Sequence, residues 1–220
     1  MPDVTFKDLC VDTTRPDEAG PFWRDLLGLS GQRQDNGDWS LTGAVPGRTV
    51  WVNTVPEPHT VKSRVHLDIR VEGEQPGALV AEHEHWTVRA DPDGLEWCAF
   101  RPRDALGPFE LCVDAADPEP IARWWADRTG ATMEPRSDEG WVALTGAAGF
   151  PYQYWVFNPV PEPKTVKNRM HWDVTLADAS VEDLVAVGAV VLRPQDDTIG
   201  WTVMADPDGN EFCAFRPRFG

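Results

Sequence analysis

Apolar and polar residues alternate in four short segments of the chain, which predicts four strands that each have one apolar and one polar face. Two of these segments are related in sequence, "RVHLDIRV" at residues 64–71 and "RMHWDVTL" at residues 169–176. The other two, "DLCVD" at 8–12 and "ELCVD" at 110–114, follow the same rule. The apolar faces are expected to lie under helices, and the polar faces collect acids, histidines, arginines and cysteines.

A helical spacing of apolar residues follows the first strand of each related pair. In residues 15–29, the pattern predicts a helix that opens at Pro16 and ends before Gly28. A second helix is expected between Asp117 as N-cap and Gly130. Strands mixed with a few helices favour an α+β fold.

The chain repeats itself once. "LCVD" occurs at residues 9 and 111, "VPEP" at 55 and 160, and "DPDGLEWCAFRPR" at 91 returns as "DPDGNEFCAFRPR" at 206. The order of the motifs is kept, which indicates a tandem duplication of about a hundred residues. We therefore predict two domains, residues 1–103 and 104–220, and a tight DPDG turn in a hairpin at the end of each.

The two copies differ between their paired strand and their final hairpin. Asp68 and Trp86 are 18 positions apart, whereas Asp173 and Trp201 are 28 positions apart. The longer segment predicts a helix with a capping box at Ser180, followed by a strand. The shorter one is expected to lack room for both elements, so the first copy would lose a strand and the second would have the better formed pocket.

Composition excludes several classes of function. The chain has 220 residues, 41% of them hydrophobic, and a formal net charge of −16. This charge repels phosphate backbones and anionic membrane surfaces, so no nucleic acid and no membrane partner are expected. The N-terminal residues do not resemble a secretion signal and the four cysteines show no CxxC spacing, which predicts a cytoplasmic protein with free thiols.

The polar faces supply the candidate binding residues. Each strand alone would suit a solvated surface, but Cys98, Phe100, Cys213 and Phe215 share the polar parity of the final hairpins and are poor choices for contact with water. A partly enclosed face is therefore favoured. The candidate ligand-binding residues are Asp8, Arg64, His66, Glu96, Cys98, Glu110, Cys112, Arg169, His171, Asp173, Glu211 and Cys213.

The segments "VPEPKTVKNRMHWDV" and "GWTVMADPDGNEFCAF", together with a helix ending in "FWRDLLGL", resemble the vicinal oxygen chelate superfamily. The similarity is to the glyoxalase-like domains of the glyoxalase and bleomycin-resistance group, once per copy. The resemblance implies tandem glyoxalase-like domains, each built of two βαβββ modules around a curved mixed sheet. The sequence leaves open whether modules pair within a copy or across copies.

The resemblance also bears on metal chemistry. Enzymes of the superfamily usually hold a divalent metal through His, Gln or Glu of the first strands and a Glu of the closing strand. The first-strand positions resemble Asp8, His66, Glu110 and His171, but Cys98 and Cys213 replace the closing glutamate. No metal and no cofactor are therefore expected, with a softer zinc site of carboxylate, imidazole and thiol as the alternative.

Tryptophan content points to a ligand. Eleven tryptophans are many for this length, and flat rings offer area for a planar molecule. Trp23, Trp97, Trp125 and Trp172 have the apolar parity of core residues, so other strand tryptophans, among them Trp51 and Trp155, are the candidates for a pocket.

Three functions remain open. The first is a metal-independent protein that binds an aromatic or drug-like molecule and sequesters a natural product. The second is a lyase, isomerase or hydrolase with an acid or base taken from His66, Asp68, His171 and Asp173. The third is a structural or interaction module, for which those residues would form a polar ladder. The chain is expected to be a monomer with pseudo-symmetric halves or a homodimer.

Overall fold

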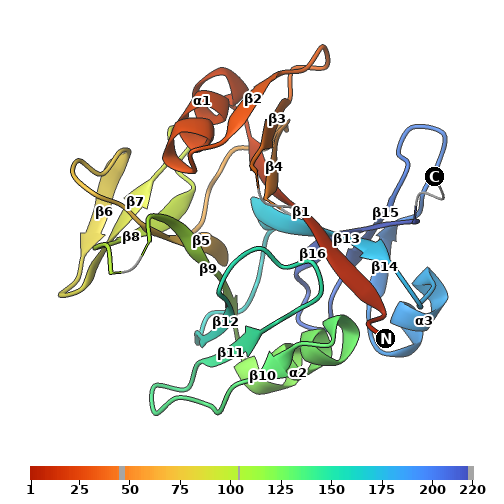
Figure 1. Cartoon of the computed structure of the whole chain (residues 1–220). Helices are drawn as coiled ribbons and strands as arrows, with labels where there is room; N and C mark the ends of the chain where they lie inside the picture. The colour runs from red at the N-terminus through yellow and green to blue at the C-terminus, as the bar shows by residue number, and fades with distance from the viewer. Residues whose placement is uncertain (45–47, 104, 218–220) are drawn as a thin grey trace.

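The computed structural model of the protein describes residues 1–44, 48–103 and 105–217. In these ranges sixteen strands form two sheets of eight, and three helices accompany them. Figure 1 shows four groups of elements arranged around the centre of the molecule, with β1 and β13 side by side. The α+β class predicted from the sequence is confirmed.

Each copy contributes two modules. The first module contains β1 (Val4–Thr13), α1 (Pro16–Leu26), β2 (Ser30–Arg33), β3 (Trp39–Thr42) and β4 (Thr49–Thr54). The second contains β5 (Val65–Arg70), β6 (Ala78–Glu82), β7 (Trp86–Ala90) and β8 (Glu96–Phe100). The third contains β9 (Gly107–Ala115), α2 (Pro118–Thr129), β10 (Thr132–Met133), β11 (Val142–Thr145) and β12 (Tyr154–Pro159). The fourth contains β13 (Met170–Leu176), α3 (Val181–Ala186), β14 (Val190–Arg193), β15 (Thr202–Ala205) and β16 (Glu211–Phe215).

The modules pair across the copies. Sheet A has the order β14-β15-β16-β13-β1-β4-β3-β2 and joins the first module to the fourth through the antiparallel pair β1 and β13. Sheet B has the order β10-β11-β12-β9-β5-β8-β7-β6 and joins the second module to the third through β5 and β9. The polar face of each sheet is therefore built from both halves of the sequence.

Each of the two longer helices is hydrogen-bonded to the final hairpin of its own copy. The side chain of Trp23 on α1 donates from Nε1 to Asp91 Oδ2 at 2.9 Å, and that of Trp125 on α2 donates to Asp206 Oδ2 at 3.0 Å. Both indoles and those of Trp97 and Trp172 are fully buried, as predicted. Trp155, a candidate for the pocket, is also fully buried and packs on Trp125. Its position on β12 gives it the same parity as its core neighbours, so that candidate was wrong.

The turns and helix caps lie where the sequence predicts them. The DPDG turns join β7 to β8 and β15 to β16, and their glycines have the positive φ that the turn requires, 92° at Gly94 and 85° at Gly209. Ser180 and Asp183 form the predicted capping box of α3. Asp117 stands at the N-cap of α2 but its side chain makes no capping hydrogen bond.

The shortened segment of the first copy keeps its strand and loses its helix. β6 pairs antiparallel with β7, and within residues 71–77, which the structure describes, no helix occurs. The expectation that this segment lacks room for both elements is confirmed, but the missing element is the helix and not the strand. This short segment contains Pro76 and Gly77 and cannot form a stable helix, whereas the five residues of β6 need only one neighbouring strand.

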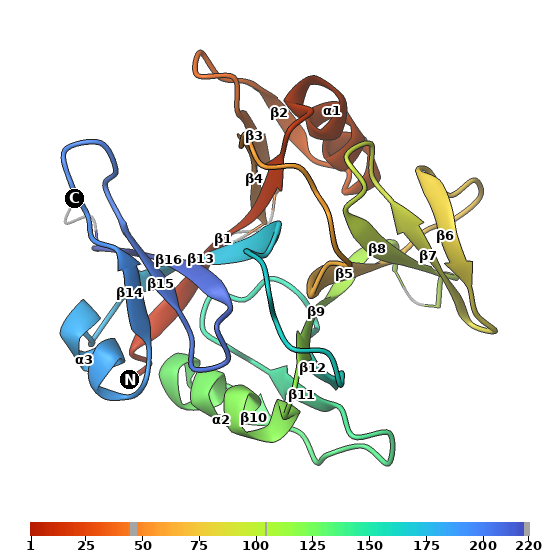
Figure 2. The same cartoon turned by 180° about the vertical axis from the view of Figure 1, so that it is seen from behind.

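Two repeated loops carry the chain between the sheets. Residues 55–64 connect β4 of sheet A to β5 of sheet B, and residues 160–169 connect β12 of sheet B to β13 of sheet A. Figure 2 shows both connections crossing the middle of the molecule. Among the helices of the described ranges, none is long and apolar enough to cross a membrane.

Candidate functional site

Equivalent clusters of ionisable residues lie on the polar faces of the two sheets. In sheet A, Cys10 is the register partner of His171, and Asp173 is the partner of both Asp8 and Cys213. In sheet B, Cys112 is the partner of His66, and Asp68 is the partner of both Glu110 and Cys98. Each cluster combines residues from both copies, because each central pair of strands does.

These side chains are buried, although they belong to the polar faces. Asp8, His171, Asp173 and Cys213 in sheet A and Asp68, Cys98 and Cys112 in sheet B are all buried, with Asp173 only 3% exposed. A fully solvated face would leave such carboxylates accessible to water. The structure therefore favours the enclosed face over the solvated one.

A carboxyl flanked by thiols stands at the centre of the sheet A cluster. The thiol of Cys10 donates to Asp173 Oδ1 at 3.5 Å. Burial is the main cause that raises the pKa of Asp173 to about 7, a net value that includes a lowering by Lys7 and a smaller raising by Asp8. Burial and the charge of Asp173 raise the pKa of the Cys10 thiol well above its usual value. At neutral pH the thiol is protonated, and Asp173 titrates near neutrality.

The sheet B cluster is built in the same way around Asp68, with Glu110 in the position that Asp8 has in sheet A. Burial raises the pKa of Asp68, and the adjacent carboxyl of Glu110 raises it again. His66 Nε2 lies 3.4 Å from Asp68 Oδ1. Burial lowers the pKa of His66 and of His171, so both imidazoles are neutral at pH 7.

A lysine and an aspartate of opposite copies meet beside each histidine. Lys62 Nζ lies 2.7 Å from Asp114 Oδ2, and Lys167 forms the equivalent ion pair with Asp12. His171 Nδ1 is 3.9 Å from Asp12 Oδ2, too far for a hydrogen bond. The sequence marked both aspartates as polar-face residues, but their partners come from the other copy and could not be assigned.

The remaining predicted site residues hold the central loops. Glu96 and Glu211 accept hydrogen bonds from the backbone N–H groups of Ser63 and Asn168, at 3.0 and 3.1 Å. Arg64 donates to the carbonyl of Glu162 at 2.7 Å, and Arg169 donates to that of Glu57. The two glutamates hold the loop of their own copy, and the two arginines bind each loop to that of the other copy.

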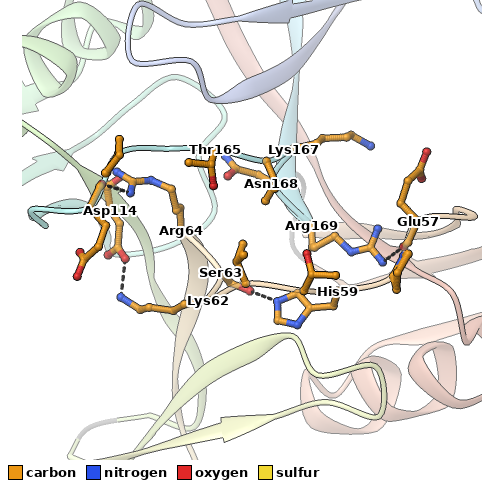
Figure 3. A pocket seen from close by; sticks show the side chains of 16 residues that line it. Glu57, His59, Lys62, Ser63, Arg64, Asp114, Thr165, Lys167, Asn168 and Arg169 are labelled. Atoms are coloured by element: carbon orange, nitrogen blue, oxygen red, sulfur yellow. Dashed lines mark hydrogen bonds and ion pairs between the residues drawn. The ribbon is translucent and has the colours of Figure 1, made fainter.

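A cavity of about 720 Å³ lies between the two repeated loops, residues 55–64 and 160–169. Figure 3 shows Arg64, Lys62 and Asp114 at one end and Arg169, Lys167 and Glu57 at the other, with Ser63, His59, Thr165 and Asn168 between them. The cations here are matched by nearby acids, including Asp93 at 3.6 Å from Arg169 Nη2. The cavity is therefore electrically balanced and carries no strong preference for an anion.

A second hollow, of about 520 Å³, opens on the polar face of sheet A beside the Asp173 cluster. The ring of Trp51 and that of Phe215 border it, and Trp51 Nε1 donates to Asp8 Oδ2 at 3.2 Å. Lys7 forms an ion pair with Asp8, lies 3.9 Å from Asp173 Oδ2, and sits 4.5 Å from the centre of the Phe215 ring. The other lining residues are Ser40, Thr42, Thr49, Thr175 and Arg216.

Sequence reasoning named Asp8 and Asp173 but did not place Lys7 in the site. Lys7 lies one position outside the alternating segment "DLCVD", and its side chain reaches the polar face only because the register of β1 with β13 shifts between Phe6 and Asp8. Alternation alone assigns such a residue to the wrong face. Trp51 could be found, since it follows the strict parity of β4.

Comparison with known proteins identifies the family. The sequence matches the glyoxalase-like domain over residues 8–100 and again over residues 110–215. The chain belongs to the glyoxalase-like domain family, within the vicinal oxygen chelate superfamily. No curated protein matches it at a significant level.

Solved structures share the fold at low identity. A mutant of glyoxalase I from Zea mays has a TM-score of 0.67 and 13% identity, covering 97% of this chain and 94% of that one. A protein of Bacillus subtilis described as a candidate dioxygenase has a TM-score of 0.64 and 12% identity, covering 100% and 87%. The cppA protein of Streptococcus pneumoniae has a TM-score of 0.51 and 11% identity, covering 97% and 100%. At these identities the likeness shows the fold alone.

The family implies a divalent metal ion. The side chains present in the two clusters decide which kind of ion would fit. A hard cation does not fit at Asp8, because the Lys7 ammonium already pairs with that carboxylate and the closing-strand position is the Cys213 thiol. A soft set does exist: single atoms of Cys10, His171 and Asp173 lie within 4.8 Å of one another, as do those of His66, Asp68 and Cys112. Thiolate, imidazole and carboxylate are zinc ligands, so zinc is the ion that these residues would hold.

Proposed function

We propose that the protein binds a small organic molecule with a flat ring in the sheet A hollow, without a metal ion, and thereby sequesters it. The observation that carries this proposal is the hollow itself. Its volume of about 520 Å³ falls in the range of ligand sites, and it combines two aromatic rings with a few convergent polar groups.

The geometry of Trp51 supports a binding role. Its indole is half-buried, and its ring is held by the hydrogen bond from Nε1 to Asp8. A ring fixed in this way offers a stacking surface at little entropic cost. The equivalent residue on sheet B, opposite Cys112 as Trp51 is opposite Cys10, is Val156.

Lys7 supports binding without a metal. Its ammonium supplies the positive charge that the two neighbouring carboxylates need, so no divalent ion is required to neutralise them. Burial raises the pKa of the Cys10 and Cys213 thiols, so a metal ion would have to displace a proton from each thiol that it bound.

The test combines a ligand screen with metal analysis. Planar aromatic compounds that bind are expected to quench tryptophan fluorescence saturably, to raise the melting temperature and to be recovered unchanged. Trp51→Val should weaken binding at least tenfold, whereas Val156→Ala on sheet B should leave it unaltered. Elemental analysis should find less than stoichiometric zinc, nickel or iron. One tightly bound zinc per sheet, or ligands that bind Trp51→Val as well as the native chain, would overturn the proposal.

A second candidate function is a lyase, isomerase or hydrolase. The observation that favours it is the proximity, within 4.8 Å, of a neutral imidazole, His171, and a carboxyl that titrates near neutrality, Asp173, in one buried cluster. Recovery of a chemically altered ligand, lost in His171→Ala, would favour this function over sequestration.

A further inference from the structure

The sheet A hollow has a wall of hydroxyl groups. Ser40 and Thr42 on β3 and Thr49 on β4 lie on one side, and Thr175 of β13 lies on the other. Thr42 makes one long bond to the carbonyl of Ser30, at 3.4 Å. Within the described part of the chain, the hydroxyls of Ser40, Thr49 and Thr175 make no hydrogen bond, so they are free to bind a ligand.

Sheet B provides an internal comparison for one of these hydroxyls, because the position of Ser40 is apolar there. Ala143 stands opposite Val156 on β11 and β12, where sheet A has Ser40 opposite Trp51. Ala143, Val156 and Cys112 form a small apolar cluster that also contacts Tyr154. Strand pairing therefore does not require the hydroxyl of Ser40. The other three positions carry polar groups in both sheets, with Thr145, Tyr154 and Arg70 where sheet A has Thr42, Thr49 and Thr175.

A carboxylate and two cations complete the hollow. Both recorded bonds to Asp8, from Trp51 and from Lys7, go to Oδ2. Oδ1 has no recorded donor among the described residues, although the atom is not fully enclosed. Lys7 and Arg216 add donors at the rim. The hollow thus offers acceptors and donors around an aromatic ring.

This combination disfavours a purely apolar ligand. A flat hydrocarbon that filled the hollow would remove water from the four hydroxyls and from Asp8 without replacing their hydrogen bonds. A sugar or cyclitol ring avoids this loss, because it places an apolar C–H face on an indole and directs its hydroxyls outward to donors and acceptors. A volume of about 520 Å³ has room for such a ring and a substituent.

We infer that the part of the ligand recognised in the sheet A hollow is a polyhydroxylated saturated ring, a glycosyl or cyclitol group, stacked on Trp51 with its hydroxyls on Ser40, Thr49, Thr175 and Asp8. This inference rests on the proposed function, since it names the ligand class of the same hollow. The flat ring of the proposed ligand is then a substituent of this group, as it is in a phenyl glycoside.

The experiment uses matched pairs of probes with the intact 220-residue protein. Phenyl glycosides of glucose, galactose and mannose are compared with phenol, and myo-inositol with cyclohexanol, by calorimetry and by quenching of tryptophan fluorescence. At least one glycoside or the inositol should bind ten times more tightly than its less hydroxylated partner. Thr49→Val and Thr175→Val conserve shape and should each weaken that binding by about 2- to 10-fold. Thr145→Val, which changes a threonine of β11 in sheet B, is the matched control and should have no effect.

The outcomes of this experiment distinguish a failure of this inference from a failure of the proposed function. If phenol and other flat aromatics bind in a Trp51-dependent manner as tightly as the glycosides, the hydroxyls are not used and the inference is wrong, while small-molecule binding stands. Insensitivity of glycoside binding to both Thr→Val changes would also overturn it. If no glycoside or cyclitol binds, the inference is wrong, and the broader aromatic screen decides the proposed function on its own.

Discussion

At the scale of single residues, Asp173 is the side chain most altered by the fold. Its carboxyl is almost fully buried between Cys10 and Cys213, and burial raises its pKa to about 7 from an ordinary value of 3.8. Lys7 and Asp8 face it from β1 and act in opposite directions, and the neutral His171 lies in the same cluster. Because its folded pKa is raised, protonation of Asp173 favours the folded state.

We therefore predict that Asp173 makes the protein less stable as the pH rises from about 4 to about 7. The folded chain retains a proton that the unfolded chain has already lost in this window, and above pH 7 both forms are ionised. A shift of about three pKa units corresponds to at most about 4 kcal/mol in the free energy of unfolding. Denaturant unfolding of Asp173→Asn should show a flatter pH profile and higher stability at pH 8 than the native chain.

Asp206 provides the control, because burial also raises its pKa, to about 6. It accepts hydrogen bonds from Trp125 and from the backbone of Asn210, so Asp206→Asn should lose stability at pH 8 while leaving the dependence on Asp173 in place. An Asp173→Asn profile parallel to that of the native chain would show that this carboxyl is not the titrating group.

At the scale of elements, alternation and capping signals predicted most strands and all three helices. The apolar parity of Val65, Leu67 and Ile69 placed these residues in the core, and the structure buries all three. What alternation could not supply was the β1 shift that directs Lys7 to the polar face, because an irregular register leaves no periodic trace. It also could not show that a strand survives where a helix is lost, since β6 is held by its pairing with β7.

One contact between elements predicts an unusual response to mutation. Gly20 lies in the middle of α1, where alanine ordinarily stabilises a helix by about 1 kcal/mol. A Cβ at this position would lie 2.4 to 2.6 Å from ring atoms of Trp39 near the root of its side chain on β3. Because these atoms cannot move far, Gly20→Ala should destabilise the fold, by about 1–3 kcal/mol.

Thermal and denaturant unfolding of Gly20→Ala test this expectation. Gly200→Ala is the matched control, since a Cβ there meets no atom within 4 Å, and it should be neutral or slightly stabilising. Gly20→Ala,Trp39→Ala should show that the two losses are not additive. A stabilised Gly20→Ala would mean that α1 and β3 separate easily, in conflict with the packing described above.

At the scale of the whole molecule, the repeat found in the sequence and the division into sheets do not coincide. β1 and β9 are close copies of one strand, and β5 and β13 of another, so the sequence offers two equally good pairings. His66 and His171 are interchangeable in pattern, and only the structure shows that His171 joins Cys10 while His66 joins Cys112. The sequence could predict which residues belong to a site. It could not predict which of them lie in the same cluster, because the loops that direct each strand to its sheet are nearly the same in both copies.

This pairing predicts how the two predicted domains behave when separated. Residues 1–103 alone retain the α1 core but lose the partners of β1 and β5, and residues 104–220 lose those of β9 and β13. Each half would also expose the backbone edge of both central strands and break the Lys62–Asp114 and Lys167–Asp12 ion pairs. Neither half should therefore form a folded monomer.

Mixed in equal amounts, the halves should assemble into a one-to-one complex with the near-ultraviolet circular dichroism of the intact chain and a single cooperative thermal transition. Analytical ultracentrifugation and calorimetry of each half and of the mixture measure this directly. A half that is monomeric and unfolds cooperatively would show that the copies, not the sheets, are the units of folding.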